Sequence, residues 1–333
     1  NSSCATCHAK GSPITQHYVP PEPYFDHFNL ATLEDPDFYP DGRDLGENYT
    51  MTGWEMNACQ INSDMHCVTC HTSSGRNRFA DNPNDACTSC HEDKESNAEL
   101  VAHTMHQPDS EGSLCVNCHA PSREFVGHFI RSDHSFRPPM PEATIKFGSP
   151  NACNQCHDDK SPKWANDIVK MRANGNYQEE TLYWAQLIKE AREGEWGRLD
   201  EMLEIINENK YNQVIVTSFI RLLANCPDDK KWDTLIAAMK ENESPLARSA
   251  AASSLTGNLS EKSRKALVNA ASDEYRLVRV SAAASLAGFE DNRFSEADNQ
   301  VVARATDEYM KSMVARPDDW SSHYNLGDRK SVV

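Results

Sequence analysis

The sequence predicts a mainly α protein in which a loop-rich domain is followed by an all-α solenoid of helical repeats. Three observations support this prediction. A Cys-x-x-Cys-His motif occurs five times before residue 158, in a region rich in Pro, Asn and Asp that shows little helical or strand periodicity. Long amphipathic helical patterns begin at Ser161, and a ten-residue segment within them recurs at an offset of 31 residues. A domain boundary is therefore expected at residue 160.

Each motif places two thiols three positions apart and an imidazole directly after the second thiol. This is the attachment pattern of c-type haem, in which both thiols form thioethers with the haem vinyl groups and the imidazole binds the iron. A zinc ribbon or a disulfide framework also pairs cysteines, but neither requires a histidine after every second cysteine. The sequence therefore predicts five covalent haem c groups, attached by Cys4, Cys7, Cys67, Cys70, Cys87, Cys90, Cys115, Cys118, Cys153 and Cys156, with proximal iron ligands His8, His71, His91, His119 and His157.

Residues 1–160 are interpreted as a pentahaem cytochrome c domain whose core is formed by the haems themselves. Ten of the 12 cysteines lie in the motifs, and Cys226, in an apolar helical stretch, is expected to be an ordinary buried thiol. The region also holds enough further histidines for every iron to bind two imidazoles. Two of them, His103 and His106, are close enough in sequence to serve two adjacent haems. The seven further histidines of this region are His17, His27, His66, His103, His106, His128 and His134.

Residues 161–316 are predicted to form a helical-repeat domain. Helical patterns cover residues 163–172, 179–193, 199–207 and 213–225 and continue to residue 313. Residues 246–255 recur as residues 277–286, with small Ala and Ser side chains that let neighbouring helices approach. Leu255 and Leu286 are expected to fill the core between repeats, and Gly257 and Gly288 to end the helices. The pattern resembles HEAT repeats, and an irregular helical bundle is the alternative.

The last residues of the chain are expected to divide into two parts. Residues 317–327 resemble the first helix of a tetratricopeptide repeat, which cannot bury its own apolar face without neighbours. Residues 328–333 can be back-translated into a common sequencing-adapter read, and they are expected to be a non-native tail.

Charge and hydropathy narrow the range of partners. The chain has 33 Lys and Arg against 50 Asp and Glu, for a net charge of −17, which argues against nucleic acid because phosphate backbones require a basic face. No apolar run approaches the roughly 18 residues that a membrane span requires. Since haem is attached to c-type cytochromes outside the cytoplasmic membrane, the protein is expected to be exported to the periplasm or beyond the cell, its signal peptide being absent from this chain.

Several segments resemble multihaem c-type cytochromes fused to HEAT or tetratricopeptide repeats. They are residues 25–28 (Phe-Asp-His-Phe), 35–43, 46–50, 131–139 and 149–157. In haem-packing style these proteins are similar to cytochrome c554 and to the multihaem nitrite reductase and hydroxylamine oxidoreductase group. The resemblance implies distal iron ligands at His27, His103, His106 and His134. His17, His66 or His128 is expected to complete the fifth site.

Electron transport is the function that these features favour, because closely packed haems pass electrons one at a time and require no chemistry of the side chains. The helical repeats are expected to dock other cytochromes, a membrane-associated redox complex or further copies of the chain in an assembly or filament, in a role such as extracellular electron transfer. The alternative is a multihaem oxidoreductase acting on a small nitrogen or sulfur compound at one open haem, so enzyme activity is left open. A fragment ending at residue 160 is expected to keep all five haems.

Overall fold

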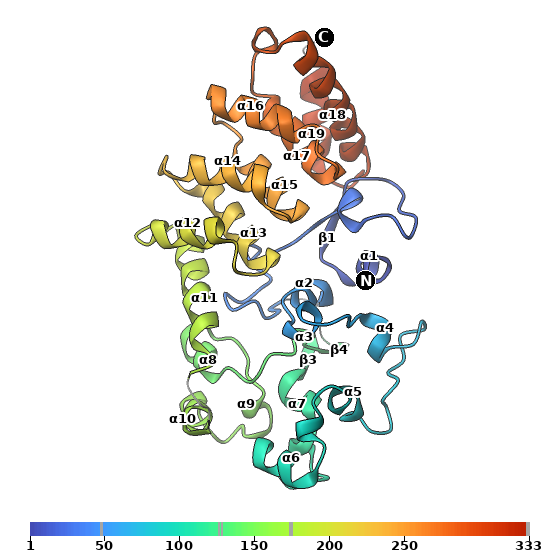
Figure 1. Cartoon of the computed structure of the whole chain (residues 1–333), viewed down its shortest axis with the longest axis vertical. Helices are drawn as coiled ribbons and strands as arrows, with labels where there is room; N and C mark the ends of the chain where they lie inside the picture. Colours follow the sequence, from blue (N-terminus) through green and yellow to red (C-terminus); the bar gives the residue numbers. More distant parts are fainter. Residues whose placement is uncertain (47–48, 126, 128, 173–175, 331–333) are drawn as a thin grey trace. The chain divides into compact units, whose positions relative to one another are not determined.

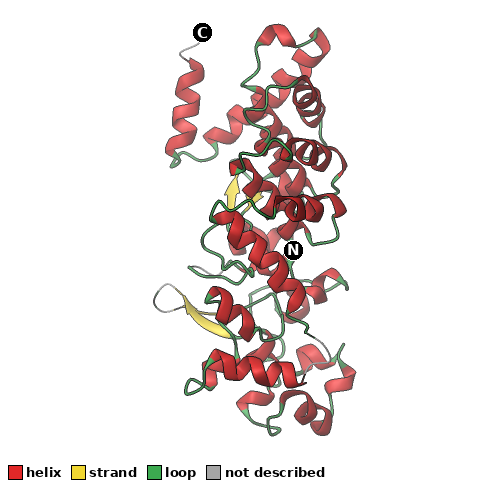
Figure 2. Ribbon diagram, turned by 90° about the vertical axis from the view of Figure 1, so that its left-hand side faces the viewer, coloured by secondary structure: helices red, strands yellow, loops and turns green. Residues whose placement is uncertain are grey.

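The computed structural model describes residues 1–46, 49–125, 127, 129–172 and 176–330, and it confirms a mainly helical chain with few, short strands (Figure 2). The chain divides into two compact units (Figure 1). The loop-rich unit comprises Asn1 and Pro36–Gln186, and the helical unit comprises Ser2–Asp35 and Leu187–Val333. This division does not coincide with the predicted boundary at residue 160, because the segment with the first motif belongs to the helical unit. A pentahaem domain over residues 1–160 stays a prediction.

The loop-rich unit is built from short helices separated by long loops. Helices of four or five residues are too short to be stable alone, so contacts outside the helix must hold them. An apolar cluster of Met140, Ala143 and Leu182, with Phe147 against it, joins α8 (Pro141–Phe147) to α11 (Glu179–Arg192). The helices are α2 (Thr50–Glu55), α3 (Ala58–Ile61), α4 (Cys67–Cys70), α5 (Asp85–Thr88), α6 (Asn97–Thr104), α7 (Cys115–His119), α8 (Pro141–Phe147), α9 (Cys153–Cys156), α10 (Pro162–Arg172) and the first part of α11 (Glu179–Arg192), with 3-10 turns η2 (Glu92–Lys94) and η3 (Glu111–Ser113).

One antiparallel hairpin accompanies these helices. Strands β3 (Ser122–Phe125) and β4 (Phe129–Ser132) pair with Ser122 opposite Ser132 and Phe125 opposite Phe129. The two serine hydroxyls lie 2.9 Å apart and close the open end of the hairpin. The hairpin leads directly into His134, so its register sets the position of that side chain.

The helical unit contains successive helix pairs, and the predicted helical patterns agree with them. Figure 1 shows α13, α15 and α17 side by side. The helices are α1 (Ser2–His8), α12 (Leu199–Glu208), α13 (Gln213–Leu222), α14 (Lys231–Glu241), α15 (Pro245–Ser254), α16 (Glu261–Ala270), α17 (Arg276–Leu286), α18 (Glu296–Val314) and α19 (Trp320–Lys330), with 3-10 turns η1 (Tyr24–Asp26), η4 (Leu223–Asn225) and η5 (Asp291–Arg293).

The sequence repeat corresponds to repeated contacts between α13, α15 and α17. The Ser254 hydroxyl at the end of α15 donates to the Ile220 carbonyl of α13 at 3.0 Å, and the Ser285 hydroxyl of α17 donates to the Ala252 carbonyl of α15 at 2.8 Å. Leu255 and Leu286 are 1% and 2% exposed, as expected for the core between repeats. These contacts show stacked helix pairs; the assignment to HEAT repeats stays a prediction.

Two arginines at equivalent repeat positions hold the loops between the pairs. Arg248 donates to the carbonyls of Asn242 and Glu243 and pairs with Asp273. Arg279, 31 positions later, donates to the carbonyls of Asp273 and Glu274 and pairs with Glu308. Each guanidinium thus binds the loop before its own helix and a carboxylate of a later element.

Glycine was expected to end a helix at two positions, and the backbone conformation agrees at one of them. Gly257 has a φ of +86°, the left-handed conformation that favours glycine after a helix. Gly288 has no such φ and is not required for this reason. Cys226 is buried, as predicted, and the ammonium group of Lys231 donates to its carbonyl and to that of Leu223. The 317–327 segment falls within and just before α19, while residues 331–333 of the expected tail lie outside the described residues.

Residues 26–35 of the helical unit lie against its helices. Strand β1 (Gly11–Pro13) pairs with β2 (Phe28–Leu30), and the chain beyond β2 contacts α13. The Arg221 guanidinium donates to Asn29 Oδ1 at 2.6 Å, the Leu30 carbonyl and Thr32 Oγ1 at 2.9 Å, and Glu34 Oε1 at 2.8 Å. Elsewhere Leu33 N donates to Ser218 Oγ at 2.8 Å, and Arg276 N donates to Asp26 Oδ1 at 2.6 Å. The segment that follows the first motif is therefore held by the repeat helices.

Candidate haem sites

Each Cys-x-x-Cys-His motif forms or ends one helical turn, which explains its spacing. Residues three apart lie on the same face of a helix, so the two thiols of a motif point to one side. In three of the motifs the backbone N–H of the histidine donates to the carbonyl of the first cysteine and closes the turn. These bonds are His71 to Cys67 at 3.0 Å, His91 to Cys87 at 2.9 Å and His157 to Cys153 at 2.9 Å.

Three proximal histidines each face a second imidazole within the loop-rich unit. The ring centroids of His71 and His134 lie 6.3 Å apart, those of His119 and His103 lie 6.0 Å apart, and those of His157 and His106 lie 6.1 Å apart. The His103 and His119 rings are nearly parallel, at 9°. The distal partners in these pairs are three of the four histidines that the family resemblance implies.

The pair geometry fits a haem iron between the rings. Two imidazoles bound to one metal at nitrogen–metal distances of about 2 Å place their ring centroids about 6 Å apart.

Hydrogen bonds fix the tautomer that iron binding requires. The Nδ1 atoms of His71, His106 and His134 lie 3.2, 2.7 and 2.9 Å from the carbonyl oxygens of Gly75, Thr104 and Ser132. A carbonyl can only accept, so each Nδ1 carries the proton and each Nε2 has the lone pair that can bind iron. Burial is the largest cause that lowers the pKa of His103 and of His119, which favours the neutral imidazole that binds a metal.

The backbone conformation of Met105 directs the side chains of His103 and His106 toward two different histidines. It ends α6 in the left-handed conformation, with φ of +63°, an uncommon value for a residue other than glycine. The reversal of backbone direction leaves His103 opposite His119 and His106 opposite His157. The sequence predicted that this histidine pair serves two haems, and the structure brings the two side chains to two different motifs.

Gly112 lies against the ring of His106, and no sequence pattern indicated this contact. A Cβ atom built on Gly112 would lie 2.3 Å from Cδ2 and 2.4 Å from Cγ of the His106 ring. We expect Gly112→Ala to displace His106 and to convert one haem from low spin to high spin in electron paramagnetic resonance (EPR) spectra. Gly197→Ala is the control, because a Cβ there meets nothing within 4 Å. An unchanged spectrum of Gly112→Ala would show that His106 is not an iron ligand.

The remaining candidate histidines have other surroundings. His27 is 5% exposed, with Nδ1 2.6 Å from Thr15 Oγ1 and Nε2 2.6 Å from a carboxylate oxygen of Glu22. His66 is exposed and begins α4, where its Nδ1 lies 3.0 Å from Thr69 Oγ1. His17 is exposed.

His128 lies outside the described residues. Among the residues that are described, no imidazole stacks on His8 or His91. Iron ligation stays a prediction for His17, His27 and His66, and also for His103, His106 and His134.

Side chains of the third, fourth and fifth motifs lie near one another. The thiols of Cys87 and Cys115 interact, and this interaction raises the pKa of Cys87 and lowers the pKa of Cys115 to about 7. Burial raises the pKa of Cys118 to about 11, and the nearby Cys153 and Cys156 contribute to the shift. Three attachment sites thus adjoin in sequence order within the loop-rich unit.

The side chains of the described residues do not form a site for a metal ion without haem. Within the part of the chain that is described, no group of three or more His, Cys, Asp and Glu side chains is placed to hold a metal ion. None of the twelve cysteines is joined in a disulfide in the part of the chain that the structure describes. The donor set, two thiols and a pair of opposed imidazoles, fits haem c and not a zinc ribbon.

No helix among the described residues is both long and apolar enough to cross a membrane.

One comparison with known proteins, the match to a family model, agrees with this chemistry. The model of the cytochrome c552 family matches residues 97–213, which include the fourth and fifth motifs and both histidines of α6 and the turn after it. Comparison with curated proteins finds no match. The crystal structure of the outer cell wall cytochrome OcwA is similar at a TM-score of 0.38 and 13% identity, over 93% of this chain and 64% of that chain. The chain thus spans less than two thirds of the length of that protein. The repeated motif and the family match together support a multihaem c-type cytochrome with covalently attached haem.

Proposed function

We propose that this protein carries electrons along a chain of five haems, most of them bound by two histidines. The observation that carries the proposal is the set of three imidazole pairs at centroid distances of 6.0–6.3 Å. Each haem, when bound, supplies an iron that accepts and releases one electron. The protein's own part is to hold each iron between two neutral imidazoles.

The ligands of each proposed site come from different parts of the loop-rich unit. His71 and His134 would hold the second haem, His119 and His103 the fourth, and His157 and His106 the fifth. The cysteines of the same motifs attach these haems, and Cys87 and Cys90 attach the third beside the fourth. Close attachment sites favour electron passage from haem to haem, because no diffusing partner is needed between them.

The helical repeats serve in this proposal as the docking part of the protein. Stacked helix pairs offer extended surfaces to a partner, which would be another cytochrome, a membrane-associated redox complex or a further copy of the chain. We place the protein in the periplasm or outside the cell, because haem attachment to such motifs takes place after export.

The proposal predicts five covalent haems per chain and no bound zinc. Mass spectrometry of the denatured protein checks the count, because thioether-linked haem stays attached when the fold is lost. Low-temperature EPR of the oxidised protein is expected to show mainly low-spin haem, the state that two imidazole ligands produce. Loss of all haem into acidified butanone would exclude the proposal.

The same spectra separate the electron carrier from an enzyme. A high-spin haem whose signal changes on addition of nitrite, hydroxylamine or sulfite would favour the second candidate, a multihaem oxidoreductase that acts on a small nitrogen or sulfur compound. Low-spin spectra that these compounds leave unchanged would favour electron transfer alone.

A further inference from the structure

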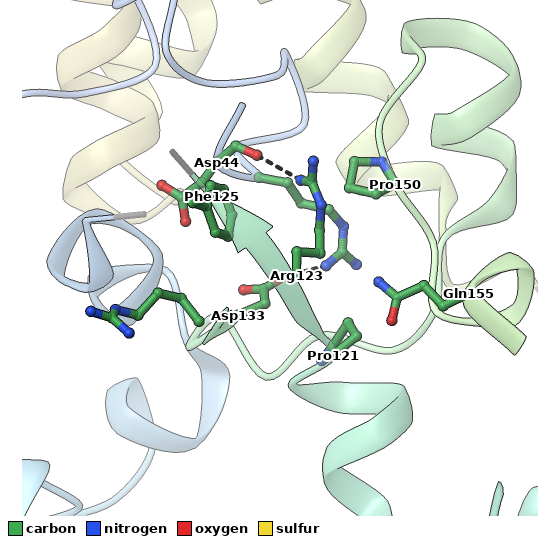
Figure 3. Close-up of a pocket in the computed structure, with 9 residues that line it drawn as sticks. Asp44, Pro121, Arg123, Phe125, Asp133, Pro150 and Gln155 are labelled. Carbon is green, nitrogen blue, oxygen red and sulfur yellow. Dashed lines mark hydrogen bonds and ion pairs between the residues drawn. The ribbon is translucent and has the colours of Figure 1, made fainter. Parts of the chain in front are cut away.

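A cavity in the loop-rich unit carries more positive than negative side chains (Figure 3). It lies between the β3–β4 hairpin, the chain before α2 and the chain at α9. Its lining includes three guanidinium groups, from Arg43, Arg123 and Arg131, and two carboxyl groups, from Asp44 and Asp133. The whole chain has a net charge of −17, whereas arginine side chains outnumber carboxyl groups at this cavity.

Arg43 is buried with an incomplete set of partners. Its side chain is 4% exposed, and its Nη1 pairs with Asp133. Its Nη2 is 3.4 Å from the Pro138 carbonyl. Its Nε has no hydrogen-bond partner within the described part of the chain, since the nearest carboxylate oxygen, of Asp41, is 3.6 Å away. A buried N–H group without a partner is unfavourable, so a further acceptor would stabilise this site.

The guanidinium of Arg123 also has N–H groups that a further acceptor could use. Its Nη1 donates to the Asp44 carbonyl at 3.0 Å, and its guanidinium lies 5.1 Å from the centre of the Phe125 ring. A guanidinium has five N–H groups, and this bond uses one of them. Figure 3 shows Arg123 among the lining residues together with Asp133 and Gln155.

The guanidinium groups at and beside the cavity, those of Arg43, Arg123, Arg131 and Arg137, outnumber the carboxyl groups, those of Asp41, Asp44 and Asp133. Burial raises the pKa of Asp44 to about 7, and the neighbouring Asp133 adds to the shift. Asp44 therefore carries less negative charge at neutral pH than an ordinary aspartate. Arg43 and Arg123 are charged at any working pH, and their planar donor sets match a planar carboxylate.

Two of the lining residues belong to proposed haem sites. Asp133 directly precedes His134, the partner of His71, and Gln155 lies between the two cysteines of the fifth motif. A haem attached at either motif brings carboxylate side chains of its own. We infer that Arg43 and Arg123 form a binding site for a carboxylate of one of these haems. The inference rests on the proposed function and adds to it a pair of residues that tune one haem.

The test replaces Arg123 in the full-length protein with all haems attached. Arg123→Gln removes a positive charge from beside a haem carboxylate, so one haem is expected to shift to a lower reduction potential. The released carboxylate is then expected to take up a proton on reduction, which makes the potential of that haem depend on pH between about pH 5 and 8. Arg123→Lys keeps the charge but not the planar donor set, and it is expected to restore the potential only in part.

Arg76→Gln is the matched control, because it removes one charge from an exposed arginine of the same unit. Spectroelectrochemical titration at several pH values gives the potentials. Equal potentials and equal pH dependence in Arg123→Gln and Arg76→Gln would overturn the inference. Should Arg123→Gln lose its fold, the comparison of Arg123→Lys with the parent protein decides in the same way.

A free oxyanion is the other source of the same chemistry, and calorimetry with phosphate and acetate distinguishes it. A site filled by a haem carboxylate is expected to bind neither anion in the parent protein. Saturable binding that Arg123→Gln abolishes would assign the site to a free anion and overturn the haem assignment. The haem count by mass spectrometry reports separately on the proposed function: a full set of haems with unchanged potentials would exclude only this inference.

Discussion

Arg221→Ala is expected to release residues 29–35 from the helices of the helical unit. The guanidinium is 16% exposed and holds four acceptors of this segment, among them the carboxylate of Glu34 and the carbonyl of Leu30. Loss of a mostly buried charged donor leaves these acceptors unpaired, and we expect the free energy of unfolding to fall by about 3 kcal/mol. Limited proteolysis with mass spectrometry should show new cleavage within residues 9–35, and chemical denaturation gives the change in stability.

Arg304→Ala is the control for this prediction, because Arg304 is an exposed arginine of α18 in the same unit.

The contacts of residues 26–35 with the repeat helices also change what we expect of a fragment that ends at residue 160. Haem attachment requires only the motif, so the fragment should still carry five haems by mass. Its residues 2–35 have lost Arg221, Ser218 and Arg276, and we expect them to be cleaved rapidly. A fragment that resists protease as the full chain does would show that these contacts contribute little.

His103→Ala and His106→Ala are expected to remove one iron ligand each, from two different haems. Each single variant should convert one haem from low spin to high spin, and the double variant should convert two, because the partners are His119 and His157 respectively. His106→Met should instead keep a low-spin haem and raise its reduction potential, since a thioether ligand favours the ferrous state. EPR and a redox titration measure both effects.

His323→Ala, at an exposed position of α19, is the control for the ligand variants. The outcome that contradicts the assignment is a double variant with no more high-spin haem than either single variant, which would place both histidines at one iron or at none. Unchanged spectra in all three variants would exclude both residues as ligands.

Local pattern was enough to predict several parts of this protein. The Cys-x-x-Cys-His spacing is a property of one helical turn, so it identifies the thiols and the proximal histidine without knowledge of the fold. The helices of residues 163–313 were predictable for a similar reason, since apolar periodicity records which face of a helix is buried. The repeat also appears in the hydrogen bonds, because the hydroxyl groups of Ser254 and Ser285 each donate to a backbone carbonyl of the preceding repeat.

The distal histidines were only partly predictable. A family resemblance implied their identity, but which proximal histidine each one faces depends on the path of the chain between residues 16 to 63 positions apart, which no local pattern determines. Met105 and Gly112 show why. The first directs two imidazoles by an uncommon backbone conformation, and the second acts by having no side chain where His106 lies.

The sequence by itself determined the haem chemistry, the helical character and the repeat, because each depends on residues within one or two helical turns or on a regular period. The tertiary structure alone decided that residues 2–35 belong with the repeat helices and that Arg43 and Arg123 line one cavity. These arrangements join residues between 80 and 250 positions apart, such as Arg43 and Arg123 or Asp26 and Arg276. Charge and hydrogen-bonding capacity indicate that such residues need partners, but only the folded chain selects which partners they find.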